Sequence, residues 1–171
     1  MKNVTDYIWF KEIFNKEEIE QIHKIAEGFP LQEGTTFGKD STYRRSEIKW
    51  LGYNTETKWI YDRLIECMKE ANDMSYGFEW EGNTEAIQYT TYDSSVKGHY
   101  DWHMDIGPEK DNSTQHLRKL SASVMLNDEY KGGELELWDK DLEGVYGTGN
   151  CMVFPSFYLH KVKPVTSGIR H

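Results

Sequence analysis

The sequence has few cysteines, no long hydrophobic run and no signal-peptide core. Its 171 residues contain two cysteines, Cys67 and Cys151, which are too few for a disulfide framework or a cysteine-ligated metal site. They favour two reduced thiols in a reducing compartment. No stretch approaches the roughly 20 apolar residues that a membrane span requires, and the N-terminus lacks an apolar signal core. These absences predict a cytoplasmic protein with no membrane partner.

Basic residues are also in short supply. The chain has 20 Lys and Arg against 29 Asp and Glu, a formal net charge of −9, and an acidic surface repels phosphate backbones. A nucleic-acid partner is therefore not expected. With 37% hydrophobic and 29% charged residues the chain should be globular, and its length fits a single domain over 1–171.

The N-terminal part, 1–78, predicts helices and early strands that support a core. Asn15 is a good N-cap and Glu18 stands at the capping-box position. An apolar stripe at helical spacing follows, and Gly28 and Pro30 end it. The stripe consists of Ile19, Ile22, Ile25 and Ala26.

A second helix is expected to begin near Asn54 or Thr55 and to close at Asn72-Asp73 and Gly77. Between the helices, a polar stretch that begins at Gly34 precedes a strand expected at 46–51. The polar stretch is equally consistent with a mobile lid near a site and with a solvated surface loop.

From 79 to 171 the pattern changes to short strands separated by Gly and Asn/Asp turns, which predicts an antiparallel sandwich or barrel. The fold class is therefore mainly β with N-terminal helices (α+β). In 120–126, even-numbered residues should face one way, and Ser121, Ser123 and Met125 the other, as the wall of a pocket. The expected strands are 85–92, 98–104, 119–127, 134–138, 151–154 and 158–164.

Three residues form a candidate metal site. His103 and Asp105 are two apart, so in a strand they point to one face. His160 can join them if the sheet folds back on itself. Two histidines and a carboxylate suit Fe(II) with open coordination positions, whereas a structural zinc site would be closed, usually by cysteines. His99 and Asp101 have the same spacing, and spacing alone does not choose between the pairs.

Arg170 stands ten residues after His160. An arginine near a metal can bind a carboxylate bidentately, which would suit a dicarboxylate that chelates the ion through its other end. A solvated terminal arginine is the alternative.

From residue 80 onward the chain resembles the iron(II)- and 2-oxoglutarate-dependent dioxygenases, and most of all the prolyl 4-hydroxylase-like branch with the PKHD-type hydroxylases. The resemblance is carried by motifs in a fixed order, which are Tyr92, Gly98-His99-Tyr100, His103-Met104-Asp105, Arg118-Lys119-Leu120-Ser121, Leu126-Asn127, Gly132-Gly133-Glu134-Leu135, Phe154-Pro155-Ser156, His160-x-Val162-x-Pro164-Val165-Thr166 and Gly168-x-Arg170. It implies a double-stranded β-helix, a jelly-roll barrel like that of the cupins, over 79–171.

The resemblance also implies roles. An aromatic residue stands three positions before the family's metal histidine, which matches Tyr100 and His103 and leaves His99 and Asp101 as neighbours. Arg170 would bind the distal carboxylate of 2-oxoglutarate, and Tyr92 would assist it. The iron ligands would be His103, Asp105 and His160, and the cosubstrate wall would be Ser121, Ser123 and Met125.

The implied activity is hydroxylation of an amino-acid side chain with Fe(II), 2-oxoglutarate and dioxygen, with release of succinate and CO2. Ascorbate (vitamin C) is a further candidate cofactor. Proline in a peptide or protein is the first expectation for the substrate; a free amino acid or other small molecule, or a cupin-like metal-binding protein without 2-oxoglutarate turnover, are the alternatives. Arg44 and Arg45 could steer an acidic or C-terminal group. Aromatic residues that could stack on a proline ring are Tyr43, Trp50, Trp80, Trp102 and Trp138.

One departure from the family concerns the end of the sequence. Family members usually continue through a further core strand after the position of Arg170, whereas this sequence stops at His171. Because termini fray unless they are tied down, Arg170 is expected to be less well held than in its relatives, and the barrel less complete.

Overall fold

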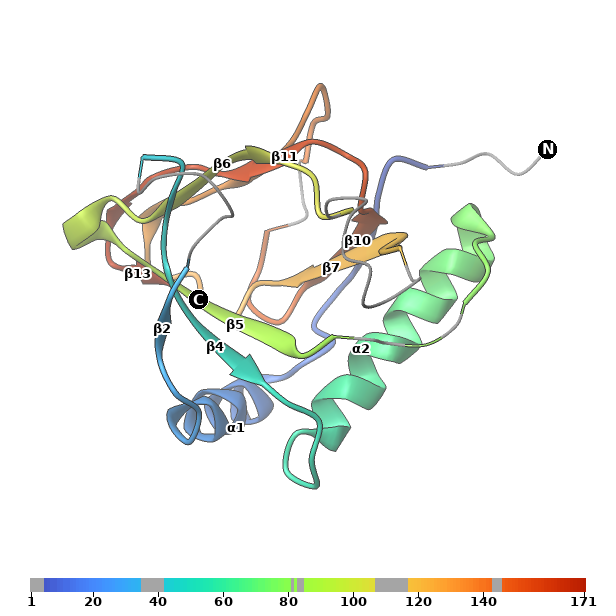
Figure 1. Cartoon of the computed structure of the whole chain (residues 1–171), viewed down its shortest axis with the longest axis horizontal. Coiled ribbons are helices and arrows are strands. Elements are labelled where there is room, and N and C mark those ends of the chain that lie inside the picture. Colours follow the sequence, from blue (N-terminus) through green and yellow to red (C-terminus); the bar gives the residue numbers. More distant parts are fainter. Residues whose placement is uncertain (1–4, 35–41, 81, 83–84, 107–116, 143–145) are drawn as a thin grey trace.

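The computed structural model describes residues 5–34, 42–80, 82, 85–106, 117–142 and 146–171, and shows two α-helices packed beside antiparallel sheets (Figure 1). The predicted class, mainly β with N-terminal helices, is confirmed. The polar stretch considered as a lid falls largely on residues 35–41, which lie outside the described residues. Neither helix in the described part has the length and apolarity needed to span a bilayer.

Helix α1 (Lys16–Glu27) has the predicted capping box. The Glu18 backbone N–H donates to Asn15 Oδ1, and the Asn15 N–H donates to Glu18 Oε2, each over 2.9 Å. These two bonds satisfy donors that a helix start leaves without partners. The face formed by Ile19, Ile22 and Ala26 is buried against the core, so sequence pattern and packing agree here.

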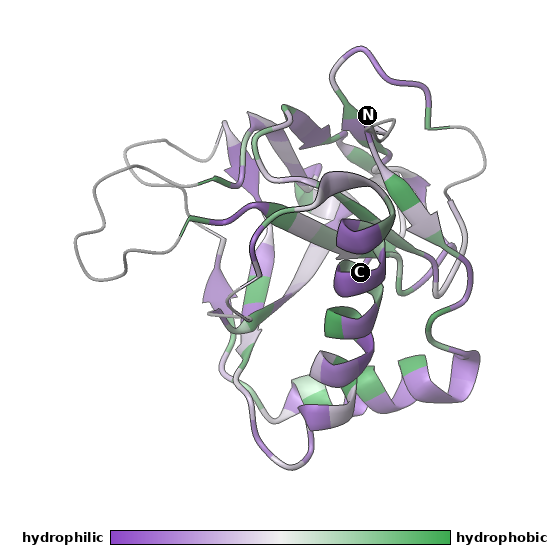
Figure 2. Cartoon of the chain, turned by 90° about the vertical axis from the view of Figure 1, so that its right-hand side faces the viewer, coloured by the Kyte–Doolittle hydropathy of each residue, from purple (hydrophilic) through white to green (hydrophobic). Residues whose placement is uncertain are grey.

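Helix α2 (Lys58–Ala71) begins later than predicted. The Asn54 side chain accepts hydrogen bonds from the N–H groups of Glu56 and Thr57, and the buried Thr57 hydroxyl donates to the Gly52 carbonyl. These bonds hold the residues before Lys58 in a turn, because Asn and Thr side chains compete with helical pairing. Figure 2, seen from the side on which α2 lies, shows the hydrophilic and hydrophobic bands of an amphipathic helix.

The predicted end of this helix is confirmed, because α2 ends at Ala71 with Asn72 as its C-cap. The chain continues as a π-helical turn, η1 (Asn72–Tyr76), and Gly77 closes it with φ 66°. The Asn72 side chain accepts from the Phe78 N–H and donates to the Phe78 carbonyl, each over 2.8 Å. Asn72 therefore ties the turn to the segment that follows it.

The strands form two principal layers. One contains the sheets ordered β13-β5-β4-β2 and β1-β10-β7, and the other the sheet β3-β6-β11-β9, with the pair β12-β8 beside them. The six strands predicted in the C-terminal part, and the one at 46–51, are all present, most of them shorter than expected. The predicted ones are β4 (Glu47–Leu51), β5 (Ile87–Asp93), β6 (His99–His103), β7 (Leu120–Val124), β9 (Leu135–Leu137), β10 (Cys151–Pro155) and β11 (His160–Val162). The others are β1 (Ile8–Phe10), β2 (Gln32–Glu33), β3 (Arg44–Arg45), β8 (Lys131–Gly132), β12 (Val165–Ser167) and β13 (Ile169–Arg170); a 3-10 turn, η2 (Ser94–Val96), follows β5.

Strand β7 separates two apolar clusters, as its alternation predicts. Leu120, Ala122 and Val124 pack with the cluster that contains the buried helix faces. Met125 belongs to the second cluster, which lies between the sheets. Because the even-numbered side chains of β7 pack toward the helices, its odd-numbered side chains lie on the inner side of the barrel, where the candidate site lies.

Candidate active site

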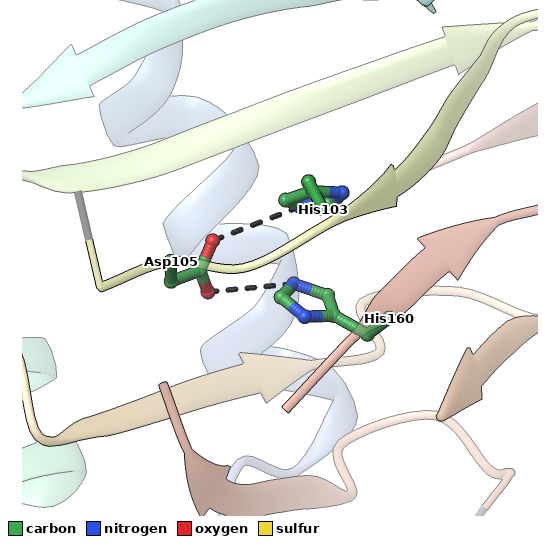
Figure 3. A group of neighbouring side chains, drawn as sticks. All are labelled: His103, Asp105 and His160. Carbon is green, nitrogen blue, oxygen red and sulfur yellow. Dashed lines mark ion pairs between the residues drawn. The ribbon is translucent and has the colours of Figure 1, made fainter. Parts of the chain in front are cut away.

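Strands β6 and β11 bring the two predicted metal histidines together. His103 and His160 are direct partners in this antiparallel pair, and Asp105 follows the end of β6. The Nε2 atom of His103 lies 3.6 Å from Asp105 Oδ1, and the Nε2 atom of His160 lies 3.4 Å from Asp105 Oδ2 (Figure 3). The three residues each offer one ligand atom, and these atoms all lie within 4.8 Å of one another. This spacing suits three ligands of one ion.

Both imidazole rings are oriented by backbone carbonyls. His103 Nδ1 lies 2.7 Å from the Asp101 carbonyl oxygen, and His160 Nδ1 lies 2.9 Å from the Tyr158 carbonyl oxygen. A carbonyl only accepts, so in each neutral ring the proton is on Nδ1 and the Nε2 lone pair faces the other ligands. The donor set of two imidazole nitrogens and a carboxylate therefore fits an Fe(II) ion with open positions.

The protonation states of the site residues also favour metal binding. Burial, and then the repulsion that a protonated His160 would exert, lower the pKa of His103 to about 4. Burial by itself would raise the pKa of Asp105, but the adjacent His160 imidazole, the hydrogen bond from the Ser121 hydroxyl and the nearby His103 outweigh it and lower that pKa to about 2. At neutral pH, His103 and Asp105 are in their metal-binding forms.

The second His-x-Asp pair does not reach the site. His99 Nδ1 lies 2.8 Å from the Lys97 carbonyl oxygen and its Nε2 lies 2.9 Å from the Thr42 carbonyl oxygen, and the exposed Asp101 accepts from the Trp102 N–H. A β-bulge explains this, because His160 pairs with His103 but Val162 pairs with Tyr100. Two steps along β11 therefore match three along β6, and the extra residue changes which side chains face inward.

Ser121 contacts the metal carboxylate directly. Its hydroxyl donates to Asp105 Oδ2 over 2.7 Å and lies 2.9 Å from the hydroxyl of the fully buried Ser156. The Asp105 N–H donates to the Ser156 carbonyl over 2.8 Å. Ser123 lines the same cavity, whereas Met125 is 2% exposed in the apolar cluster and is not among the lining residues. Met125 therefore packs in the apolar core and does not line the cavity as expected.

Arg170 lies in the cavity that contains the triad, which has a volume of about 540 Å³. Its guanidinium lies 5.3 Å from the ring centre of Tyr92, its partner in the β13–β5 pair. Arg170 is 5% exposed, and its Nε atom has no hydrogen-bond acceptor within the described part of the chain. A buried cation with a free donor is suited to receive a carboxylate.

The expectation that Arg170 is loosely held is wrong. Besides its pairing in β13, the residues on either side of it are fixed by Asn127, which donates to the Ile169 carbonyl over 2.7 Å and accepts from the His171 N–H over 2.9 Å. The Leu126 N–H also donates to the His171 carbonyl. Side-chain and backbone bonds together hold this segment in the sheet.

Comparison with known proteins agrees with this geometry. The model of the family described as "2OG-Fe(II) oxygenase superfamily" matches residues 87–171. A PKHD-type hydroxylase of Prochlorococcus marinus is 27% identical over 164 residues, covering 93% of this chain and 72% of the relative. A PKHD-type hydroxylase of Stutzerimonas stutzeri is 37% identical over 84 residues, covering 43% of this chain and only 35% of the relative.

Solved structures share the fold. A viral collagen prolyl hydroxylase from Paramecium Bursaria Chlorella virus-1, in a 2OG complex, has a TM-score of 0.70 and 18% identity, over 97% of this chain and 92% of that one. A Trichoplax adhaerens prolyl hydroxylase, in complex with a hypoxia inducible factor peptide fragment, has a TM-score of 0.72 and 18% identity, over 96% and 80%. The predicted double-stranded β-helix is thereby confirmed.

Proposed function

The chain belongs to the 2OG-Fe(II) oxygenase superfamily, and from this premise we propose that it hydroxylates an amino-acid side chain with release of succinate and CO2. Fe(II) and 2-oxoglutarate are the metal and cosubstrate of this family, and the donor set of His103, Asp105 and His160 fits the metal. The observation that carries the proposal is that this triad and Arg170 line one cavity.

Each residue has a part in this proposal. His103, Asp105 and His160 hold the iron, which together with 2-oxoglutarate and dioxygen supplies the oxidising chemistry when bound. Arg170 binds the distal carboxylate of the cosubstrate through its planar fork of N–H groups. Tyr92, 4% exposed, packs against Arg170 and supports it. Ser121 keeps the Asp105 carboxylate turned toward the metal, and Ser123 forms part of the cosubstrate wall.

For the substrate we propose proline in a peptide or protein. Support comes from the fold neighbours, which include a Pseudomonas putida prolyl-4-hydroxylase and the viral collagen prolyl hydroxylase. Trp102 and Trp138 also form an edge-to-face pair with ring centres 5.2 Å apart, and Trp138 is 59% exposed. Exposed aromatic faces recognise proline-rich segments. A free amino acid is the second candidate, because its carboxylate would suit the charge of Arg44 described below.

An anaerobic titration of the metal-free protein tests the activity without any substrate. Fe(II) is added first and 2-oxoglutarate second, while visible absorbance is followed. We expect a weak metal-to-ligand charge-transfer band that requires both additions, followed by slow succinate formation when air is admitted. Iron binding with no such band would refute 2-oxoglutarate chelation and favour the cupin-like alternative.

A further inference from the structure

Arg44 is a second buried cation in the candidate active site. It is 8% exposed, and its Nε donates to Ser46 Oγ over 2.8 Å. Its Nη2 atom has no hydrogen-bond acceptor among the residues that the structure describes. A buried charged group without a counterion is unfavourable unless a ligand supplies one.

Arg44 contacts the same aromatic ring as the metal ligand His103. Arg44 pairs with Tyr100 across β3 and β6, and its guanidinium carbon lies 4.4 Å from the centre of the Tyr100 ring. The same ring stacks on the imidazole of His103, with centres 3.4 Å apart. Arg44 therefore lines the cavity from the β6 sheet, while Arg170 lines it from the β5 sheet.

The surroundings fix the Arg44 side chain. A Cβ atom built on Gly34 would come within 2.9 Å of Arg44 Nε, so the backbone closes tightly around the Arg44–Ser46 pair. The close backbone and the hydrogen bond from Nε to Ser46 restrict the movement of the guanidinium. A pre-oriented donor loses less conformational entropy when it binds a ligand.

Charges in the loaded site do not balance without a further anion. The two charges of the metal and the charge of Arg170 are offset by Asp105 and the two carboxylates of 2-oxoglutarate. Arg118, which also lines the cavity, is paired with Glu85 over 2.7 Å. The positive charge of Arg44 remains, beside a ring that touches a metal ligand.

We propose that Arg44 binds a carboxylate of the substrate and holds it near the metal. This inference rests on the proposed function and narrows its substrate to molecules with such a group. The carboxylate belongs either to a free amino acid or to the C-terminal residue of a peptide. A guanidinium recognises both in the same bidentate way.

The test uses the protein loaded with Mn(II) and saturating 2-oxoglutarate, so that Arg170 and the metal are occupied. Acetate and its neutral isostere acetamide are the probes, and paramagnetic broadening of their methyl proton signals reports binding near the metal. We expect saturable broadening of acetate and none of acetamide. Arg44→Gln should weaken acetate binding about tenfold or more while 2-oxoglutarate affinity stays unchanged.

Arg45→Gln is the matched control, since it removes a charge from the adjacent residue, whose side chain is exposed; acetate binding should be unaltered. Arg44→Lys keeps the positive charge but lacks the planar guanidinium, so it should give an intermediate affinity for acetate. This variant keeps the proposal testable if Arg44→Gln folds poorly. Equal acetate affinity in wild type and Arg44→Gln, or a loss of 2-oxoglutarate affinity instead, would overturn the assignment. Absence of any 2-oxoglutarate binding would refute the proposed function itself, and the inference with it.

The same measurement distinguishes the two sources of the carboxylate. L-Proline and N-acetyl-L-proline carry the same carboxylate, but only the second mimics a C-terminal peptide residue. Broadening of L-proline alone would identify a free amino acid, and broadening of N-acetyl-L-proline alone a peptide end. If neither is broadened while acetate is, Arg44 does not hold a substrate carboxylate of this kind and the proposal fails.

Discussion

The Ser121→Ala substitution should weaken metal binding while leaving the protein folded. The Ser121 hydroxyl donates to Asp105 Oδ2 over 2.7 Å, and a hydrogen bond to a charged group contributes about 1.5–3 kcal/mol. Since about 1.4 kcal/mol corresponds to a tenfold change in an equilibrium constant, the metal dissociation constant should rise roughly 10- to 100-fold. Residues that orient metal ligands commonly have effects of this size.

A smaller effect on stability is expected at the same position. Ser121 is also a hydrogen-bond partner of the fully buried Ser156 hydroxyl, which alanine would leave with one partner fewer. The cost should be about 1 kcal/mol, a fall in melting temperature of roughly 2–4 °C for a chain of this size. The metal-free variant should therefore remain folded at room temperature, which makes the affinity measurable.

The assay is an anaerobic calorimetric titration of Fe(II) alone, without 2-oxoglutarate, into metal-free protein. Ser123→Ala is the control, because Ser123 lies two residues further along the inner side of β7 and has no hydrogen bond to Asp105. Its metal affinity should match that of the wild type. If Ser121→Ala and Ser123→Ala bind iron equally well, the hydrogen bond does not support the ligand and the reasoning is refuted.

Three further predictions concern the same site. His103→Ala should abolish the charge-transfer band that needs Fe(II) and 2-oxoglutarate, whereas His99→Ala should largely spare it; equal loss would mean that the wrong His-x-Asp pair had been chosen. Arg170→Ala should raise the 2-oxoglutarate dissociation constant roughly 10- to 100-fold with metal affinity little changed, and an unaltered 2-oxoglutarate affinity in calorimetry would remove that assignment. Burial lowers the pKa of His103 to about 4 in the folded protein, whereas the ordinary value of a histidine is 6.5. Acidification of the metal-free protein from pH 6.5 to pH 4 therefore protonates this imidazole in the unfolded state before it does so in the folded state. The loss of stability should be up to roughly 3 kcal/mol. Urea unfolding at several pH values measures this loss, and a slope no steeper than that of His103→Ala would contradict it.

Local sequence signals predicted the elements whose structure is locally determined. The capping box of Asn15 and Glu18 marks the start of α1 because both of its bonds lie within four residues. The start of α2 was missed because Thr57 bonds back to Gly52 rather than capping the helix. Two-residue strands such as β3 and β13 have no pattern of their own. They are defined only by partners distant in the sequence, and pairing of that kind is not encoded locally.

The metal triad could be found from spacing and residue chemistry, but the burial of Arg44 could not. In the sequence, Arg44 and Arg45 are two adjacent basic residues in a polar region, and surface charges are the ordinary interpretation. Pairing with β6 turns Arg44 toward Tyr100 and Arg45 toward His99. Which of the two enters the cavity is set by strand register, and a shift of one residue would exchange them.

The bulge in β6 connects these observations. Without it, strict alternation would put His99, Asp101 and His103 on one face of the strand and Tyr100 on the other. The extra residue between Tyr100 and His103 instead brings these two side chains to the same side, where their rings stack. The outward turn of His99, the choice of His103 as ligand and the contact of Arg44 with Tyr100 then follow from one irregularity. Metal binding and the proposed carboxylate site thus depend on the same local geometry, because a bulge re-aims neighbouring side chains together.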